Sequence, residues 1–231
     1  MPKSEPVQEP PLYLTVLTAF GWASMGVVFG LVYFISFPLQ VYTNQSELNE
    51  AIDRKESPHV APGEAYYFEG PVLRTKSWAP KRKQFVSGEA EQLRFEVGEL
   101  NGWLESYFKP VKQGPGEDSG GLTIRPDVGN LAIVDAGRMY VNLPARLEVF
   151  GWQGEFVLSA TGQFKSGSPA RFKVERMYLN NARLPAVVGK QLLNRLVGAY
   201  RRTEEYGQIR QAWQRVESVE LEEGALRLNL R

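Results

Sequence analysis

The chain has 231 residues, a formal net charge of +1, one histidine and no cysteine. This length suits one ordinary domain with accessory segments, and the small net charge gives no overall field that attracts nucleic acid. The lack of cysteine excludes disulfides, thiolate catalysis and cysteine-ligated zinc, and it fits either a reducing compartment or a bacterial envelope.

Residues 12–39 form the strongest signal in the sequence, an apolar run within a stretch that carries no charge between Glu9 and Glu47. About 20 apolar residues cross the hydrocarbon core of a bilayer, where the backbone must be helical. A cleaved signal peptide has a shorter apolar region and a basic start. A buried core helix is the other alternative. We predict an uncleaved, single-pass transmembrane helix.

The short tail, residues 1–11, gives little information about the orientation of this helix, because it contains one basic residue, Lys3, and two acids. The positive-inside rule therefore decides little. We expect the tail inside and the C-terminal domain outside the cytoplasmic (inner) membrane of a bacterial cell. Gly26 and Gly30 have the GxxxG spacing that lets two membrane helices approach closely, which predicts a homodimer, although this spacing is also common by chance.

Residues 40–85 are expected to form a juxtamembrane helix followed by a connector. The helix is expected over 44–57, with Ser46 as its cap. His59 lies in the proline-rich break that follows and is expected in a solvated loop.

Within and just beyond this connector, residues 72–88 contain five basic side chains and no acid, namely Arg74, Lys76, Lys81, Arg82 and Lys83. One interpretation is contact with anionic lipid headgroups at the membrane surface. The alternative is a solvated, partly helical connector that tucks Trp78 and Phe85 against the domain.

The main domain is expected over residues 86–231. Its first pattern alternates apolar and polar residues over 93–97 and then switches to a helical period over 99–108. Gly98 stands at the switch and is expected to cap the helix. Ten residues are too few for a helix to persist alone in water, so its aromatic face must pack against another element.

Alternation over 138–150, 155–165 and 170–179 predicts three long strands, with a bulge near Arg176. Residues 122–126 and 130–134 predict two shorter strands. Strands with one polar and one apolar face are typical of an antiparallel sheet that is covered on one side.

A second helix is predicted after Pro185, with a buried stripe, and a third over 204–215. A hairpin around Glu223–Gly224 ends the chain. The stripe consists of Val188, Leu192, Leu196 and Tyr200. The sheet is expected to close around the helices. The predicted fold class is α+β, with an N-terminal transmembrane helix followed by a curved antiparallel sheet packed around two or three helices.

The order of motifs in this domain resembles that of the YpmS-like bacterial membrane-anchored proteins. The motifs are the E-L-N-x-W-L stretch at residues 99–104, the strands after it, the leucine–proline step into a helix at 184–196 and the terminal hairpin. More distantly they are similar to tubular lipid-binding (TULIP) and AsmA-like envelope domains. The resemblance implies a curved sheet wrapped around a long helix, with acyl chains between them in the lipid-binding relatives. The alternative is that this short domain has no ligand cavity, because its own aromatic side chains fill the space between sheet and helix.

The expected function is therefore that of an envelope domain that binds membrane lipid or another hydrophobic ligand. Its lining is predicted to include Trp103, Tyr107, Phe108, Phe156, Leu192 and Leu196, although an ordinary closed core needs the same stripes. The alternative is a structural or scaffolding subunit with an envelope protein partner. No recognisable catalytic constellation is present, and neither a metal nor a cofactor is expected.

Overall fold

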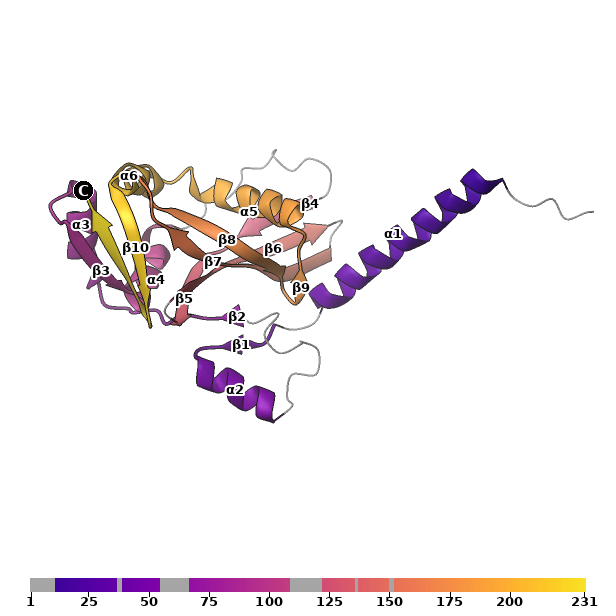
Figure 1. The fold of residues 1–231 in the computed structure, drawn as a ribbon, viewed down its shortest axis with the longest axis horizontal. Coiled ribbons are helices and arrows are strands. Elements are labelled where there is room, and N and C mark those ends of the chain that lie inside the picture. The colour runs from indigo at the N-terminus through magenta and orange to yellow at the C-terminus, as the bar shows by residue number, and fades with distance from the viewer. Residues whose placement is uncertain (1–10, 37–38, 55–66, 109–121, 136, 150–151) are drawn as a thin grey trace, which may run out of the picture.

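The computed structural model describes residues 11–36, 39–54, 67–108, 122–135, 137–149 and 152–231. Over these residues the chain forms six helices and a mostly antiparallel set of strands, so the predicted α+β class is confirmed. Figure 1 shows a twisted, curved sheet with helices at one end and along one face, and a long helix that projects from the other end.

The projecting helix is α1, Leu12–Ser36, which confirms the helix predicted from the apolar run. Among the residues that the structure describes, no helix has both the length and the apolar character that a membrane crossing requires. The membrane-spanning role of α1 stays a prediction.

A small unit follows α1 beneath the sheet (Figure 1). It contains β1 (Val41–Tyr42), α2 (Gln45–Asp53) and β2 (Tyr67–Phe68), and the two strands pair in parallel. The cap of α2 is Asn44, whose Oδ1 accepts a hydrogen bond from the backbone N–H of Glu47 at 2.9 Å. The prediction that Ser46 caps this helix was wrong by two positions. His59 lies outside the described residues.

The larger sheet contains six strands. They are β4 (Leu122–Pro126), β5 (Asn130–Asp135), β6 (Arg138–Val149), β7 (Trp152–Lys165), β8 (Arg171–Leu179) and β9 (Ala182–Arg183). Strands β4 and β5 both pair with β6, at 145–149 and 138–142 respectively, and therefore share one edge. The predicted bulge is confirmed, because the register of β7 against β8 shifts between Thr161 and Gly162, opposite Arg176.

Helix α5, Ala186–Tyr200, covers the apolar face of this sheet. Leu196 is 1% exposed and packs with Leu143 and Leu158 of the sheet. The first turn of α5 differs from the prediction, because Val188 is 50% exposed and Gly189 lies against Met177 instead. The contact face is shifted by one residue because glycine brings the helix backbone close to β8.

A second, three-stranded sheet forms the other end of the domain, with the order β10-β11-β3. Its strands are β3 (Gln92–Glu96), β10 (Val216–Glu222) and β11 (Ala225–Leu230), and the predicted terminal hairpin is confirmed. Helices α3 (Trp78–Ser87), α4 (Val97–Tyr107) and α6 (Glu204–Trp213) pack with this sheet in one apolar cluster. The expectation of a single sheet that closes around the helices was therefore wrong.

The switch of period at Gly98 has a different cause from the one predicted. Helix α4 starts at Val97, and its cap is Glu96, which forms a reciprocal capping box with Glu99. Gly98 lies instead against Leu73, whose N–H donates to the Gly98 carbonyl at 2.9 Å. Glycine is needed here because the extended segment before α3 passes directly over the first turn of α4.

Candidate functional site

The apolar pocket lies where the two sheets and helices α3, α4 and α6 meet. It has a volume of about 190 Å³, and no polar atom is exposed in its lining. The lining residues are Phe85, Phe95, Leu100, Trp103, Leu104, Phe108, Leu131, Met139, Phe164, Ile209, Trp213, Leu226 and Leu228. These residues come from both halves of the domain, so the pocket exists only in the assembled fold.

Trp103 is the central aromatic residue of the pocket wall. Its ring lies 5.9 Å from that of Phe95 in a stacked arrangement and 6.5 Å from that of Phe108 in an edge contact. Phe108 also packs against the apolar cluster beneath α5. The wall is therefore continuous with the core of the larger sheet.

A buried carboxylate holds Trp103 in place. The indole N–H donates to Glu205 Oε1 at 2.6 Å, and Glu205 is only 4% exposed. The two carboxylate oxygens accept from Nε and Nη2 of Arg82, also at 2.6 Å. A bidentate, charge-assisted pair of this kind is strong and directional, so it fixes α3, α4 and α6 around the pocket.

Glu99 makes a second bridge between α3 and α4. Burial raises the pKa of Glu99, but hydrogen bonds from Lys81, from the backbone N–H of Glu96 and from Ser77 outweigh it and leave the pKa below its ordinary value of 4.5. The Lys81 Nζ to Glu99 Oε2 distance is 2.5 Å. The carboxylate is therefore charged at neutral pH and fixes the start of α4.

Three asparagines fasten the extended segment that follows β2. The Asn142 amide donates to the Phe68 carbonyl at 2.7 Å, and Asn130 and Gly70 exchange two hydrogen bonds of 2.9 and 3.0 Å. Asn101 on α4 donates to the carbonyls of Pro71 and Leu131, both at 2.9 Å. These contacts join the unit after α1 to the pocket region. Sequence reasoning missed them, because no local pattern reveals partners that lie so far along the chain.

The structure divides the six predicted ligand-lining residues into three groups. Trp103 and Phe108 line the pocket, whereas Phe156, Leu192 and Leu196 belong to the separate cluster beneath α5. Tyr107 points outward and is 48% exposed, with its ring against Trp78 and beneath Arg82. Their role in ligand binding stays a prediction.

The five basic residues predicted for membrane contact lie on α3 and in the segment just before it. Lys81 and Arg82 are engaged by Glu99 and Glu205, whereas Arg74, Lys76 and Lys83 are exposed. Figure 1 shows α3 at the end of the domain opposite to α1. Trp78 and Phe85 are buried, as the connector interpretation expects.

The GxxxG pair on α1 is open to a partner. Apart from the nearby backbone of α1 itself, a methyl group added at Gly26 or Gly30 would meet no atom of the described residues within 4 Å. Pairing of this helix stays a prediction.

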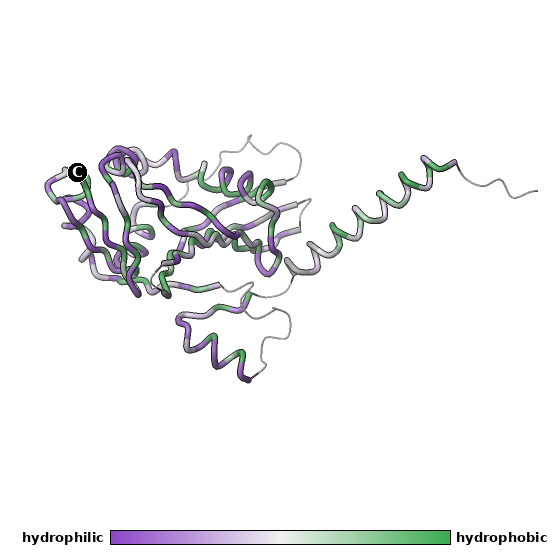
Figure 2. The backbone as a smooth tube through the Cα atoms, viewed as in Figure 1, coloured by the Kyte–Doolittle hydropathy of each residue, from purple (hydrophilic) through white to green (hydrophobic). Residues whose placement is uncertain are grey.

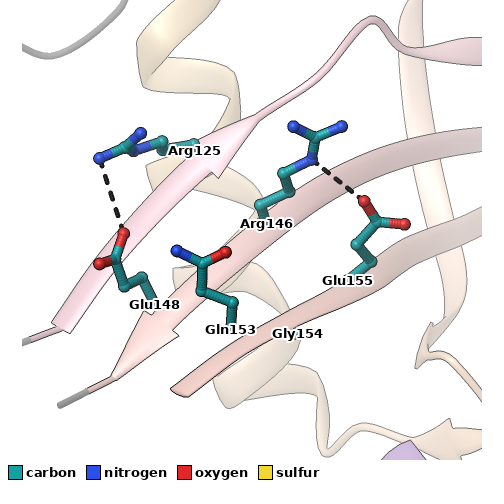
Figure 3. Close-up of a pocket in the computed structure, with 6 residues that line it drawn as sticks. All are labelled: Arg125, Arg146, Glu148, Gln153, Gly154 and Glu155. Atoms are coloured by element: carbon teal, nitrogen blue, oxygen red, sulfur yellow. Dashed lines mark hydrogen bonds and ion pairs between the residues drawn. The ribbon is translucent and has the colours of Figure 1, made fainter. Parts of the chain in front are cut away.

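Two open hollows lie at the α1 end of the larger sheet. The first, of about 520 Å³, is lined by two exposed ion pairs, Arg125–Glu148 at 3.6 Å and Arg146–Glu155 at 3.1 Å (Figure 3). The second, of about 470 Å³, is lined in part by Ser36 at the end of α1. Exposed ion pairs contribute at most about 1 kcal/mol each, so these hollows have no fixed polar site comparable to the Glu205 network.

Within the described part of the chain, no three acidic or histidine side chains cluster as metal ligands. The buried carboxylates of Glu99 and Glu205 are occupied by cations of the same domain. No family model, curated protein or solved structure matches the chain, so the apolar pocket itself is the basis for a functional assignment.

Proposed function

We propose that the protein is a single-pass, membrane-anchored envelope domain that binds the acyl chain of a lipid, or another slender hydrophobic ligand, in the pocket beside Trp103. The observation that carries this proposal is the wholly apolar pocket of about 190 Å³. An apolar chain that entered this pocket would remove its lining from water, and each Å² of apolar surface buried in this way stabilises the complex by about 25 cal/mol.

The size of the pocket limits what it can hold. An apolar cavity of about 150 Å³ binds a benzene-sized molecule, whereas sites for drug-sized ligands have about 300–1,000 Å³. The pocket, at about 190 Å³, therefore fits part of one chain rather than a whole lipid. The polar end of such a ligand would remain outside the pocket.

The membrane anchor in this proposal is α1. The described residues alone do not make α1 a membrane-crossing helix, but its complete sequence of 25 residues contains no charged side chain, and Figure 2 shows it mostly white to green. A helix of this length spans about 37 Å, and the hydrocarbon core of a bilayer is about 30 Å thick. Leu12, Phe20 and Trp22 are more than 70% exposed, which is costly in water and favourable in lipid.

Scaffolding in an envelope complex is the second candidate function. It is favoured by the small size of the pocket and by the aromatic side chains that fill most of the interior around it, including Phe95 and Phe164. In this alternative the domain needs no ligand, and its role is to hold a partner protein near the membrane. We propose for either candidate that the domain is not an enzyme.

Photolabelling tests the ligand-binding proposal. Native membrane vesicles that contain the full chain are incubated with a fatty acid that carries a diazirine in its acyl chain, then irradiated, and the labelled peptides are mapped by mass spectrometry. We expect label on α1 and, separately, on the pocket residues of α4 and β11. Leu104→Trp, which places a larger side chain in the pocket and obstructs it, should remove the α4 and β11 label and leave the α1 label unchanged.

Val72→Trp is the matched control, because Val72 is 44% exposed and does not line the pocket. It should keep the full labelling pattern. Label confined to α1 in the unmodified chain would contradict ligand binding and leave scaffolding as the better account. A chain without label on α1 would contradict the anchor.

A further inference from the structure

We infer that the N-terminal turn of α5 and the basic face behind it form a second membrane contact, which docks the domain onto the anionic phospholipid headgroups of the bilayer that holds α1. This inference rests on the proposed role of α1 as a membrane anchor. It assigns headgroup contact to the end of the domain nearest α1, and not to the basic segment at α3.

The first observation is an exposed apolar tip. Val187 is 71% exposed and Val188 is 50% exposed, although both belong to the main domain and not to α1. Among the described residues outside α1, Val187 is the most exposed large apolar side chain. Two adjacent valines at the end of a helix have the form of an insertion that reaches the boundary between headgroups and acyl chains.

The second observation is the charge around this tip. Residues 183–195, which surround this tip and continue along α5, contain three basic side chains and no acidic one. Arg183, Lys190 and Arg195 are exposed, and Lys190 lies one turn after Val187 on the same side of α5. An apolar tip with a basic, acid-free helix behind it complements a surface of lipid phosphates, where each nearby cation adds to the attraction.

The third observation is position. Helix α1 contacts β9, the short strand that leads directly into α5. Ser36, the last residue of α1, lines a hollow together with Asn180 and Val157 of the larger sheet. In Figure 1 the N-terminus of α5 lies at the end of the domain from which α1 projects, and α3 lies at the opposite end. A bilayer that contains α1 therefore meets the α5 tip before it meets α3.

Site-specific labels test this contact in the full chain. Because the protein has no cysteine, a single introduced cysteine gives one label site. Val188→Cys, Lys83→Cys and Val27→Cys variants carry a fluorophore and are reconstituted in phosphatidylcholine vesicles with and without phosphatidylglycerol. A lipid with a nitroxide just below its headgroup serves as the quencher. The Val188 label should be quenched several-fold more than the Lys83 label, and more strongly when phosphatidylglycerol is present.

The Val27 label separates two kinds of failure, because Val27 lies in the middle of α1. Quenching at Val27 by a lipid with a deep nitroxide, without quenching at Val188, would overturn the docking inference and leave the anchor intact. Absence of quenching at Val27 would overturn the anchor and the docking inference together.

A charge reversal completes the test. Lys190→Glu combined with Arg195→Glu should lower the quenching of the Val188 label in the anionic vesicles at least twofold. The matched pair, Arg74→Glu with Lys76→Glu, should leave that quenching unchanged. Equal losses for the two pairs would show attraction by net charge alone and would contradict a defined docking surface.

Discussion

Arg82 and Glu205 lie 123 residues apart in the sequence and form a bidentate pair with both nitrogen–oxygen distances at 2.6 Å. The same carboxylate accepts the indole N–H of Trp103. The buried Glu205 carboxylate on α6 therefore holds α3 through Arg82 and α4 through Trp103, which forms part of the pocket wall. The geometry of the pocket depends on this polar network as much as on apolar packing.

Glu205→Gln is expected to destabilise the domain by about 3 kcal/mol. Removing one partner from a buried ion pair costs about 3–5 kcal/mol, and the lower end applies because the side chain of Arg82 keeps 21% of its exposure. Urea unfolding of the full chain in detergent, followed by near-ultraviolet circular dichroism, measures this loss. Glu204→Gln, at the exposed neighbouring position, should change the free energy of unfolding by less than about 0.5 kcal/mol. Similar losses in the two variants would contradict the role of the buried pair.

Two glycines in neighbouring helices should respond to alanine with opposite signs. A Cβ atom at Gly102 would lie 2.4 Å from the Leu73 carbonyl oxygen, so Gly102→Ala must displace the segment over α4 and should cost about 1–3 kcal/mol. At Gly207 on α6, such a Cβ atom would have no atom of the described residues within 4 Å apart from the nearby backbone of its own helix. Gly207→Ala should therefore stabilise the domain by about 0.5–1 kcal/mol. Thermal unfolding measures both changes, and stabilisation by Gly102→Ala would contradict the close contact.

The stability of the domain should fall in acid because of Glu99. Its pKa in the folded state is below the ordinary value of 4.5, so the unfolded state binds more protons in this range. The stabilisation from Glu99 is fully present above about pH 5 and is lost as the pH falls through 4.5 towards the folded pKa. Unfolding free energies measured between neutral pH and pH 3 should show this loss, and Glu99→Gln should flatten it.

Lys81→Met supplies the companion test. Because Lys81 donates to the Glu99 carboxylate, its removal should raise the folded-state pKa of Glu99 and so reduce the loss of stability in acid. Lys83→Met, two residues away at an exposed position, should leave the loss of stability below about pH 5 as it is in the unmodified chain. If neither Glu99→Gln nor Lys81→Met changed how the free energy of unfolding falls in acid, the loss would have to come from other carboxylates.

Local patterns in the sequence predicted the secondary structure well, because helix and strand periods are set by neighbouring residues. The change of period at Gly98, the long strands of the larger sheet, the bulge at Arg176 and the final hairpin could all be predicted in this way. The position of Val188 could not, since it depends on how closely Gly189 approaches Met177 on another element.

The pocket itself was only half predictable. Trp103 and Phe108 belong to an apolar helical face that the sequence makes evident. The opposite wall includes Leu226 and Leu228, and their position depends on β11 pairing with β3 across about 130 residues of chain. The division of the strands into two sheets, and the partner of Glu205, likewise follow from long-range pairing that no local period encodes.

Native mass spectrometry of the full chain, released from a detergent micelle after purification from its own membranes without added lipid, tests the central claim most directly. The account predicts one bound lipid or fatty acid per chain in the unmodified protein and in Val72→Trp, and its loss in Leu104→Trp. A ligand-free mass for the unmodified chain, with Leu104→Trp equally well folded, would contradict the claim that the pocket beside Trp103 is a binding site.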